Sequence, residues 1–133
     1  MSATILACAV VPEIDVGFDV EEIRPAPLDV ARRFAPSEQS DITSCRPEER
    51  DERFFSYWTL KESYMKARGL GLAIPLDGAV FDLSSAHVSA SLGAETLDDA
   101  RDWRFVSWSI EGAYRVALAV KTREDVRIAL SSL

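Results

Sequence analysis

The spacing of apolar and polar residues along the chain predicts strands near both ends. Residues 4–11 (TILACAVV) form an apolar, β-branched run, and residues 15–21 (DVGFDVE) alternate between apolar and polar side chains, so two adjacent strands are expected there. Similar strand-like runs follow in the second half of the chain, at residues 79–83, 86–92, 102–110 and 113–120. The dipeptide Glu111-Gly112 separates the last two runs and is typical of a hairpin turn. The tail, residues 124–133, fits a short strand or a helix.

The middle of the chain has a helical pattern instead. Residues 28–34 predict a short helix, and a second helix is expected to begin at Pro36, since proline suits the first turn. A longer helix is expected over residues 47–68, with a length of roughly 30 Å at 1.5 Å per residue. Gly69 and Gly71 follow it and favour its end.

Together these elements predict a single α+β domain over residues 1–133, in which a helical middle packs against a mostly antiparallel sheet. A chain of 133 residues can bury a core without covalent cross-links. Cys8 and Cys45 are far apart and form no CxxC motif, so reduced thiols in a cytoplasmic protein are the expected state.

The charge of the chain narrows the classes of function. Its formal net charge of −7 argues against a nucleic-acid surface, which needs clustered lysine and arginine, and it fits cation binding better. The apolar start of the chain precedes the first basic residue, Arg24, and is too short to span a bilayer. We therefore expect neither a signal peptide nor a membrane anchor.

The alternating strand at residues 15–21 carries two carboxylates on one face. The strand period of two puts three apolar residues on the other face, Val16, Phe18 and Val20. We expect that apolar face to point into the core. Asp19 and Glu21 then have Cα atoms about 6.5 Å apart, with Gly17 clearing space beside them. Two such carboxylates repel each other unless a cation lies between them, and Mg²⁺ is the natural candidate. The alternative is an ordinary solvated strand edge.

The stretch FFSYWTLKESYMKARGLGL, residues 54–72, mixes charged and aromatic side chains on one side of the predicted helix. Trp58, Glu62 and Lys66 fall within about 80° of one another on a helical wheel. Charges there need a partner, because an unpaired charge in an apolar sector is costly. Glu62 and Lys66 could satisfy each other as an i, i+4 pair. Alternatively, Glu62 faces the carboxylate strand as a third oxygen ligand, while Lys61 and Lys66 contact phosphate oxygens.

Three segments resemble motifs of the 4′-phosphopantetheinyl transferases, specifically the surfactin-type group. VGFDVEEIRP at residues 16–25 is similar to the family's G-[VI]-D-[VI]-E strand, with Phe18 as a mild departure. WTLKESYMKARGLGL at residues 58–72 is similar to the helix W-[ST]-x-K-E-[AS]-x-x-K-x-x-G-x-G. RRFAPSE at residues 32–38 resembles the segment between these motifs, although the family's is usually one residue longer, and it sets Glu38 opposite a family glutamate near the substrate. The residues that match the two main motifs are Gly17, Asp19, Glu21, Trp58, Thr59, Lys61, Glu62, Ser63, Lys66, Gly69 and Gly71.

The resemblance implies an activity and roles for the matching residues. The family transfers the 4′-phosphopantetheine arm of coenzyme A to a serine of an acyl or peptidyl carrier protein, as holo-carrier-protein synthases do. By this resemblance, Asp19, Glu21 and Glu62 hold Mg²⁺, and Lys61, Lys66 and Glu38 contact coenzyme A. Glu62 is the candidate to take the serine proton, and Lys66 supports the departing group.

The resemblance covers the C-terminal half of surfactin-type enzymes, in which two similar halves bind coenzyme A between them. Three hypotheses follow: a half-domain that needs a complementing N-terminal half, a self-associating enzyme, or a scaffold that binds a carrier protein without catalysis. The first two predict an exposed apolar surface to which Trp103, Phe105 and Trp108 could contribute. The alternative is that these aromatic residues belong to the core of a strand pair.

Overall fold

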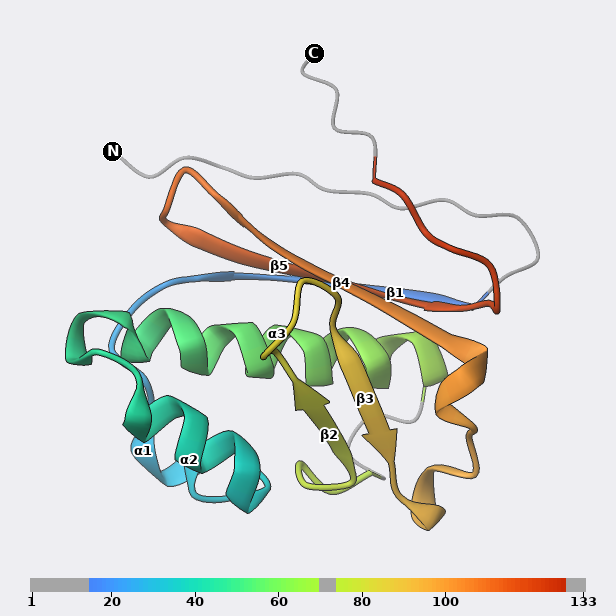
Figure 1. The fold of residues 1–133 in the computed structure, drawn as a ribbon, viewed down its shortest axis with the longest axis horizontal. Helices are drawn as coiled ribbons and strands as arrows, with labels where there is room; N and C mark the ends of the chain where they lie inside the picture. The colour runs from blue at the N-terminus through green and yellow to red at the C-terminus, as the bar shows by residue number, and fades with distance from the viewer. Residues whose placement is uncertain (1–14, 70–73, 129–133) are drawn as a thin grey trace.

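A computed structural model describes residues 15–69 and 74–128 and shows an α+β fold built around one long helix (Figure 1). Its elements, in chain order, are β1 (Val16–Glu22), α1 (Leu28–Ala31), α2 (Pro36–Ser44), a 3₁₀ turn (Pro47–Glu49), α3 (Arg50–Arg68), β2 (Ala79–Asp82), β3 (Ser89–Leu92), two further 3₁₀ turns (Ala94–Thr96 and Ala100–Asp102), β4 (Trp103–Ile110) and β5 (Tyr114–Lys121). The α+β class predicted from the sequence is confirmed. The predicted strand over residues 4–11 and Gly71 lie outside the described residues. Within those residues, no helix is both long and apolar enough to cross a membrane.

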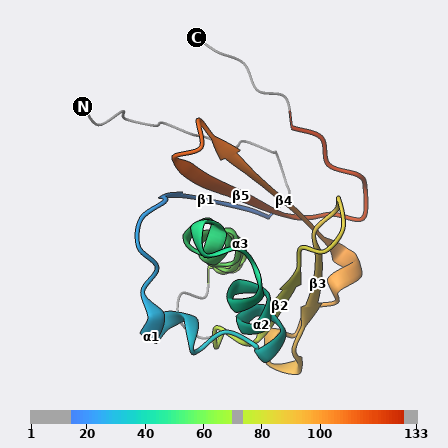
Figure 2. The ribbon, with the colours of Figure 1, turned by 60° about the vertical axis from the view of Figure 1, so that its left-hand side comes forward.

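The main sheet is antiparallel and lies along one side of α3. Its strand order is β1-β5-β4, and β2 and β3 form a separate antiparallel pair. Figure 2 shows this sheet on one side of α3, with α1, α2 and the β2-β3 pair on the other. The predicted turn between β4 and β5 is present, and Glu111 and Gly112 both have positive φ angles, 54° and 66°. Such angles match the right-handed twist of the flanking strands.

Helix α3 contributes more residues to the core than any other element, and most of its aromatic residues are buried. Phe54, Phe55 and Tyr64 are almost fully buried. The Tyr64 ring packs edge-on against Trp103 at 5.0 Å between centroids, and Trp103 and Phe105 are core residues rather than parts of an exposed surface. The helix ends where Gly69 adopts a left-handed conformation (φ 67°) and its N–H bonds to the carbonyl oxygens of the last turn.

One prediction about β1 is wrong, because its apolar face does not point into the buried core. Gly17 and Asp19 are buried against the helix, whereas Val16, Phe18 and Val20 lie half-buried on the opposite face of the sheet. There the Phe18 ring lies 6.2 Å from the ring of Trp108, between centroids. Both faces of this sheet carry apolar residues, so the alternation along a single strand could not tell which face meets the helix.

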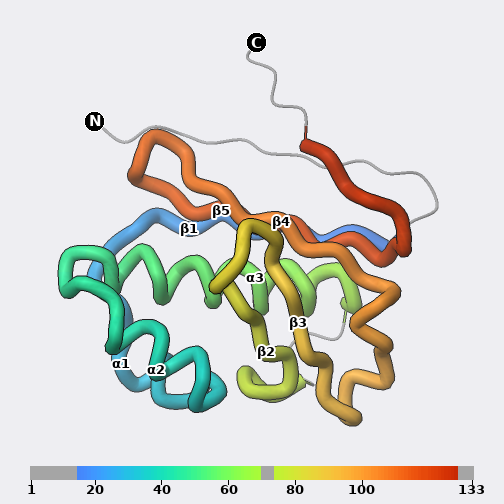
Figure 3. Tube along the Cα trace, in the orientation of Figure 1, coloured from blue at the N-terminus to red at the C-terminus, as the bar shows by residue number. Residues whose placement is uncertain are grey.

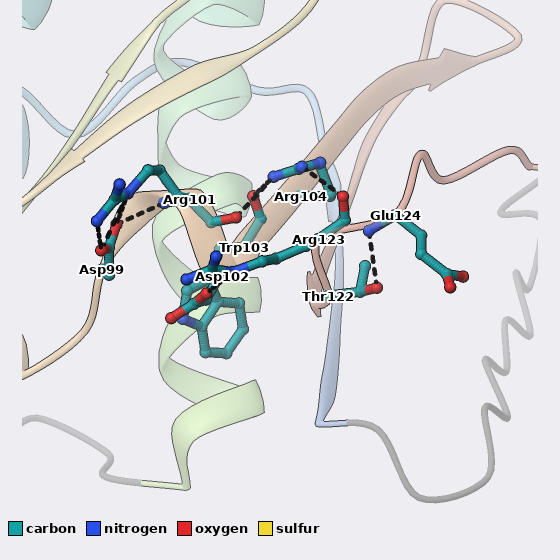
Figure 4. Close-up of polar contacts among 8 residues, drawn as sticks. All are labelled: Asp99, Arg101, Asp102, Trp103, Arg104, Thr122, Arg123 and Glu124. Atoms are coloured by element: carbon teal, nitrogen blue, oxygen red, sulfur yellow. Dashed lines mark hydrogen bonds and ion pairs between the residues drawn. The ribbon is translucent and has the colours of Figure 1, made fainter.

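The chain after β5 is held against the start of β4 by polar contacts (Figure 4). Arg104 donates hydrogen bonds to the carbonyl oxygens of Trp103 and Arg123, at 2.9 and 2.8 Å. Arg123 in turn forms an ion pair with Asp102. Residues 122–128 form neither helix nor strand, so the described part of the tail has neither of the two structures expected for residues 124–133.

Candidate active site

Strand β1, which carries Asp19 and Glu21, lies in direct contact with helix α3, which carries Glu62 and Lys66 (Figure 3). The contact depends on Gly17, where a Cβ atom would lie 1.8 Å from the carbonyl oxygen of Ser63 and 2.5 Å from the backbone nitrogen of Ala67. No side chain other than hydrogen fits there. Glycine thus lets β1 approach α3 closely enough for residues 19 and 21 to face the helix.

Asp19 is the carboxylate most deeply enclosed in this contact. It is 5% exposed, and its Oδ1 accepts a hydrogen bond of 2.6 Å from the ammonium group of Lys66. Its Oδ2 is buried without a hydrogen-bond partner. Burial raises the pKa of Asp19, and the Lys66 ammonium opposes this effect. Asp19 therefore has one oxygen free to accept a cation or a donor.

Glu62 and Glu21 add two more negative charges near Asp19. Burial raises the pKa of Glu62 first of all, and the negative charge of Asp19 raises it further, with a smaller effect from Glu21. The negative charges of Asp19 and Glu21 thus act on Glu62. Lys66 forms its ion pair with Asp19 on β1 rather than with Glu62 on its own helix, so the simple i, i+4 pair is not what satisfies Lys66.

A divalent ion fits the chemistry of this cluster. Carboxylate oxygens are the ligands that Mg²⁺ prefers, and a bound cation would remove both the repulsion and the unpartnered state of the Asp19 Oδ2 atom. Within the described residues, no three histidine, cysteine, aspartate or glutamate side chains already stand in an arrangement that could hold a metal ion. The convergence of Asp19, Glu21 and Glu62 on one ion therefore stays a prediction.

Glu21 is held in place by two donors that the sequence did not indicate. The indole N–H of Trp58 donates to Oε1 at 3.3 Å, and the Arg24 guanidinium donates to Oε2 at 3.2 Å. The one available signal was the spacing of three residues between Glu21 and Arg24 at the end of a strand.

Lys61 and Glu38 form a buried ion pair on the side of α3 away from β1. Lys61 is 2% exposed, and its ammonium donates to Glu38 Oε1 at 2.7 Å and to the carbonyl oxygens of Leu76 and Ala79. Glu38 is fully buried and also accepts the backbone N–H groups of Ala35 and Phe81. All three ammonium protons are used inside the protein, where the pair joins α2, α3 and β2. The contact of Lys61 and Glu38 with coenzyme A stays a prediction.

Comparison with known proteins decides the family. The family model of the 4′-phosphopantetheinyl transferase superfamily matches residues 15–119. The chain belongs to this superfamily. A 4′-phosphopantetheinyl transferase of Bacillus subtilis is 37% identical over 89 residues, covering 65% of this chain and 39% of the relative. The 4′-phosphopantetheinyl transferase Sfp of Bacillus subtilis strain 168 is 29% identical over 104 residues, covering 77% and 45%. These matches support the surfactin-type group predicted from the motifs.

The fold has a counterpart among solved structures of the superfamily. The holo-[acyl-carrier-protein] synthase of Thermotoga maritima has a TM-score of 0.67 at 24% identity, covering 84% of this chain and 65% of that one. This likeness shows the phosphopantetheinyl transferase fold. The chain spans less than half the length of the two curated relatives named above.

Proposed function

We propose that this phosphopantetheinyl transferase chain moves the 4′-phosphopantetheine arm of coenzyme A to a serine of an acyl or peptidyl carrier protein, with Mg²⁺, in the cytoplasm. The observation that carries the proposal is the contact of β1 with α3, which sets a buried Asp19 with an unpartnered oxygen beside Lys66 and Glu62. Membership of the superfamily supports the reaction class.

The residues of the contact have distinct tasks in this proposal. Asp19, Glu21 and Glu62 would hold the Mg²⁺ ion, which when bound supplies positive charge to the pyrophosphate of coenzyme A. Lys66 is exposed for about half of its side-chain surface and can add its own positive charge to the phosphate oxygens. Its ion pair with Asp19 fixes the ammonium near the centre of the cluster.

The chemical step needs a base, and Glu62 is the residue proposed for it. The serine oxygen attacks the β-phosphorus of coenzyme A and forms a new P–O bond. The bond from that phosphorus to the bridging oxygen breaks, and adenosine 3′,5′-bisphosphate leaves. Glu62 lies in the same contact as Asp19, and its carboxylate is proposed to accept the serine proton, directly or through a water.

A single assay tests the proposal. The chain is mixed with an apo carrier protein, coenzyme A and Mg²⁺, and mass spectrometry scores the gain of one phosphopantetheine group on the carrier. Asp19→Asn should abolish transfer without unfolding the protein, because it removes a ligand charge and keeps the volume. Asp125→Asn, a change of the same kind at an exposed position, should leave the rate unchanged.

Variations of the same assay separate the forms that the enzyme can take. A specific rate that rises with chain concentration indicates self-association. Transfer that requires the added N-terminal half of a related enzyme indicates a half-domain. Absence of transfer under both conditions, with binding of the carrier protein retained, would contradict the proposal and favour a non-catalytic scaffold.

A further inference from the structure

We propose that Arg24 and Trp58 are positioning residues that hold the carboxylate of Glu21 in the orientation needed to bind the metal ion. The inference rests on the proposed function, since it concerns the same site. Two contacts fix Glu21, one on each carboxylate oxygen.

Glu21 needs such support because of where it lies. It sits near the end of β1, with about a quarter of its side chain exposed, so packing alone does not fix its rotamer. The negative charges of Asp19 and Glu62 in the same contact repel it. A free Glu21 side chain would therefore turn away from them into solvent.

Trp58 supplies a rigid donor on the helix side. Its ring stacks on Phe54, with centroids 6.3 Å apart and planes inclined by 11°. Phe54 is itself almost fully buried, so the indole has little freedom to move. The indole N–H that reaches Glu21 Oε1 is thus fixed relative to α3, the helix that also carries Glu62. Trp58 therefore couples the position of one predicted ligand to the element that holds another.

Arg24 supplies the second donor, from the chain just after β1. Half of its side-chain surface is exposed, yet three contacts restrain the guanidinium. One is the bond to Glu21 Oε2, another is a bond of 2.8 Å to the carbonyl oxygen of Glu22, and the third is the ring of Phe55, whose centroid lies 4.6 Å away. A planar guanidinium that is stacked and hydrogen-bonded at once is already ordered before it meets the carboxylate.

The two donors leave Glu21 able to bind a cation. Each carboxylate oxygen can accept more than one interaction, so one hydrogen bond on each leaves acceptor capacity for a metal. Partners that orient metal ligands in this way typically change metal affinity 10- to 100-fold when they are removed. We expect the loss of either donor to weaken metal binding about tenfold, and the loss of both to weaken it further.

The test measures metal binding directly and does not depend on turnover. Free Mn²⁺ is quantified by electron paramagnetic resonance during titration of the intact chain, with and without coenzyme A. Trp58→Phe removes the N–H donor together with the five-membered ring of the indole, and Arg24→Met removes the guanidinium while keeping the apolar stem over Phe55. Urea unfolding of each variant shows that it is folded, and Arg24→Met changes a surface residue, so it serves as the second variant if Trp58→Phe loses stability.

A matched control comes from another arginine–glutamate pair three residues apart. Arg46 bonds to Glu49 at 3.0 Å on the surface, and Arg46→Met should leave Mn²⁺ affinity unchanged. Arg24→Lys keeps the charge without the planar fork and should recover only part of the affinity. In the transfer assay, the loss should appear as a higher Mg²⁺ concentration for half-maximal rate, with the rate largely restored at saturating Mg²⁺.

The outcomes distinguish this inference from the proposed function. Wild-type binding of Mn²⁺ with equal affinity in both variants would overturn the positioning role and leave the metal site standing. A wild-type chain that binds no Mn²⁺, even with coenzyme A, would refute the metal site and this inference together.

Discussion

The buried pair of Lys61 and Glu38 makes the sharpest prediction about stability. Lys61→Met removes a charge that is 2% exposed and leaves the fully buried Glu38 carboxylate without its counter-ion. The carbonyl oxygens of Leu76 and Ala79 lose their donor as well. Breaking a buried ion pair on one side costs about 3–5 kcal/mol, which is a large share of the 5–15 kcal/mol that stabilises a typical domain.

Urea unfolding followed by tryptophan fluorescence measures this loss. We expect the free energy of unfolding to fall by about 3–5 kcal/mol for Lys61→Met. The double variant Lys61→Met with Glu38→Gln should lose less free energy of unfolding than the sum of the two single variants. Each single variant leaves one uncompensated charge in the core, whereas the double variant leaves none. The exposed pair of Arg46 and Glu49 is the control, and Arg46→Met should cost less than about 1 kcal/mol.

The same variant decides whether Lys61 touches the substrate. If its role is structural, the folded fraction of Lys61→Met keeps its affinity for coenzyme A, measured by calorimetry under stabilising conditions. An unchanged free energy of unfolding together with weakened binding of coenzyme A would refute the structural role. That result would support the contact between Lys61 and the phosphate groups of coenzyme A that the sequence motif implied.

Three further predictions concern the backbone and the metal. Gly17→Ala should lower the free energy of unfolding by about 1–3 kcal/mol and abolish transfer. The new Cβ overlaps the carbonyl oxygen of Ser63 and must push β1 away from α3. An unchanged denaturation midpoint would contradict this close contact. Gly112→Ala should cost only about 1 kcal/mol, because its φ of 66° strains the backbone but nothing crowds the new atom, and transfer should be retained. Mg²⁺ at about 100 times its dissociation constant should stabilise the chain by about 2.7 kcal/mol in thermal melts, and a chelator or Asp19→Asn should remove this gain.

Much of the secondary structure could be predicted from the chain itself. The alternation over 15–21, the late strand runs and the glycine after residue 68 correspond to β1, the β2 to β5 strands and the end of α3. These signals are local, since they depend on periodicity and on the backbone freedom of glycine. The motifs were equally local, and the family that they indicated is confirmed.

The site depended on information that is not local. The alternation of β1 correctly separated Asp19 and Glu21 from the apolar residues, but the prediction that the apolar face points into the core was wrong. Lys61 and Lys66 lie five positions apart on one helix, yet one is sealed in the core with Glu38 and the other reaches Asp19. Their different roles follow from the elements that pack on each side of α3.

The sequence by itself thus determined which elements form, the family to which they belong and which residues carry charge near the helix. Only the tertiary structure decided which of those charges remain available to a ligand. The physical reason is that a buried charge must find its partners within the fold, and those partners come from other elements distant in the chain. For Lys61 they are Glu38, Leu76 and Ala79, while for Asp19 one oxygen is left without any.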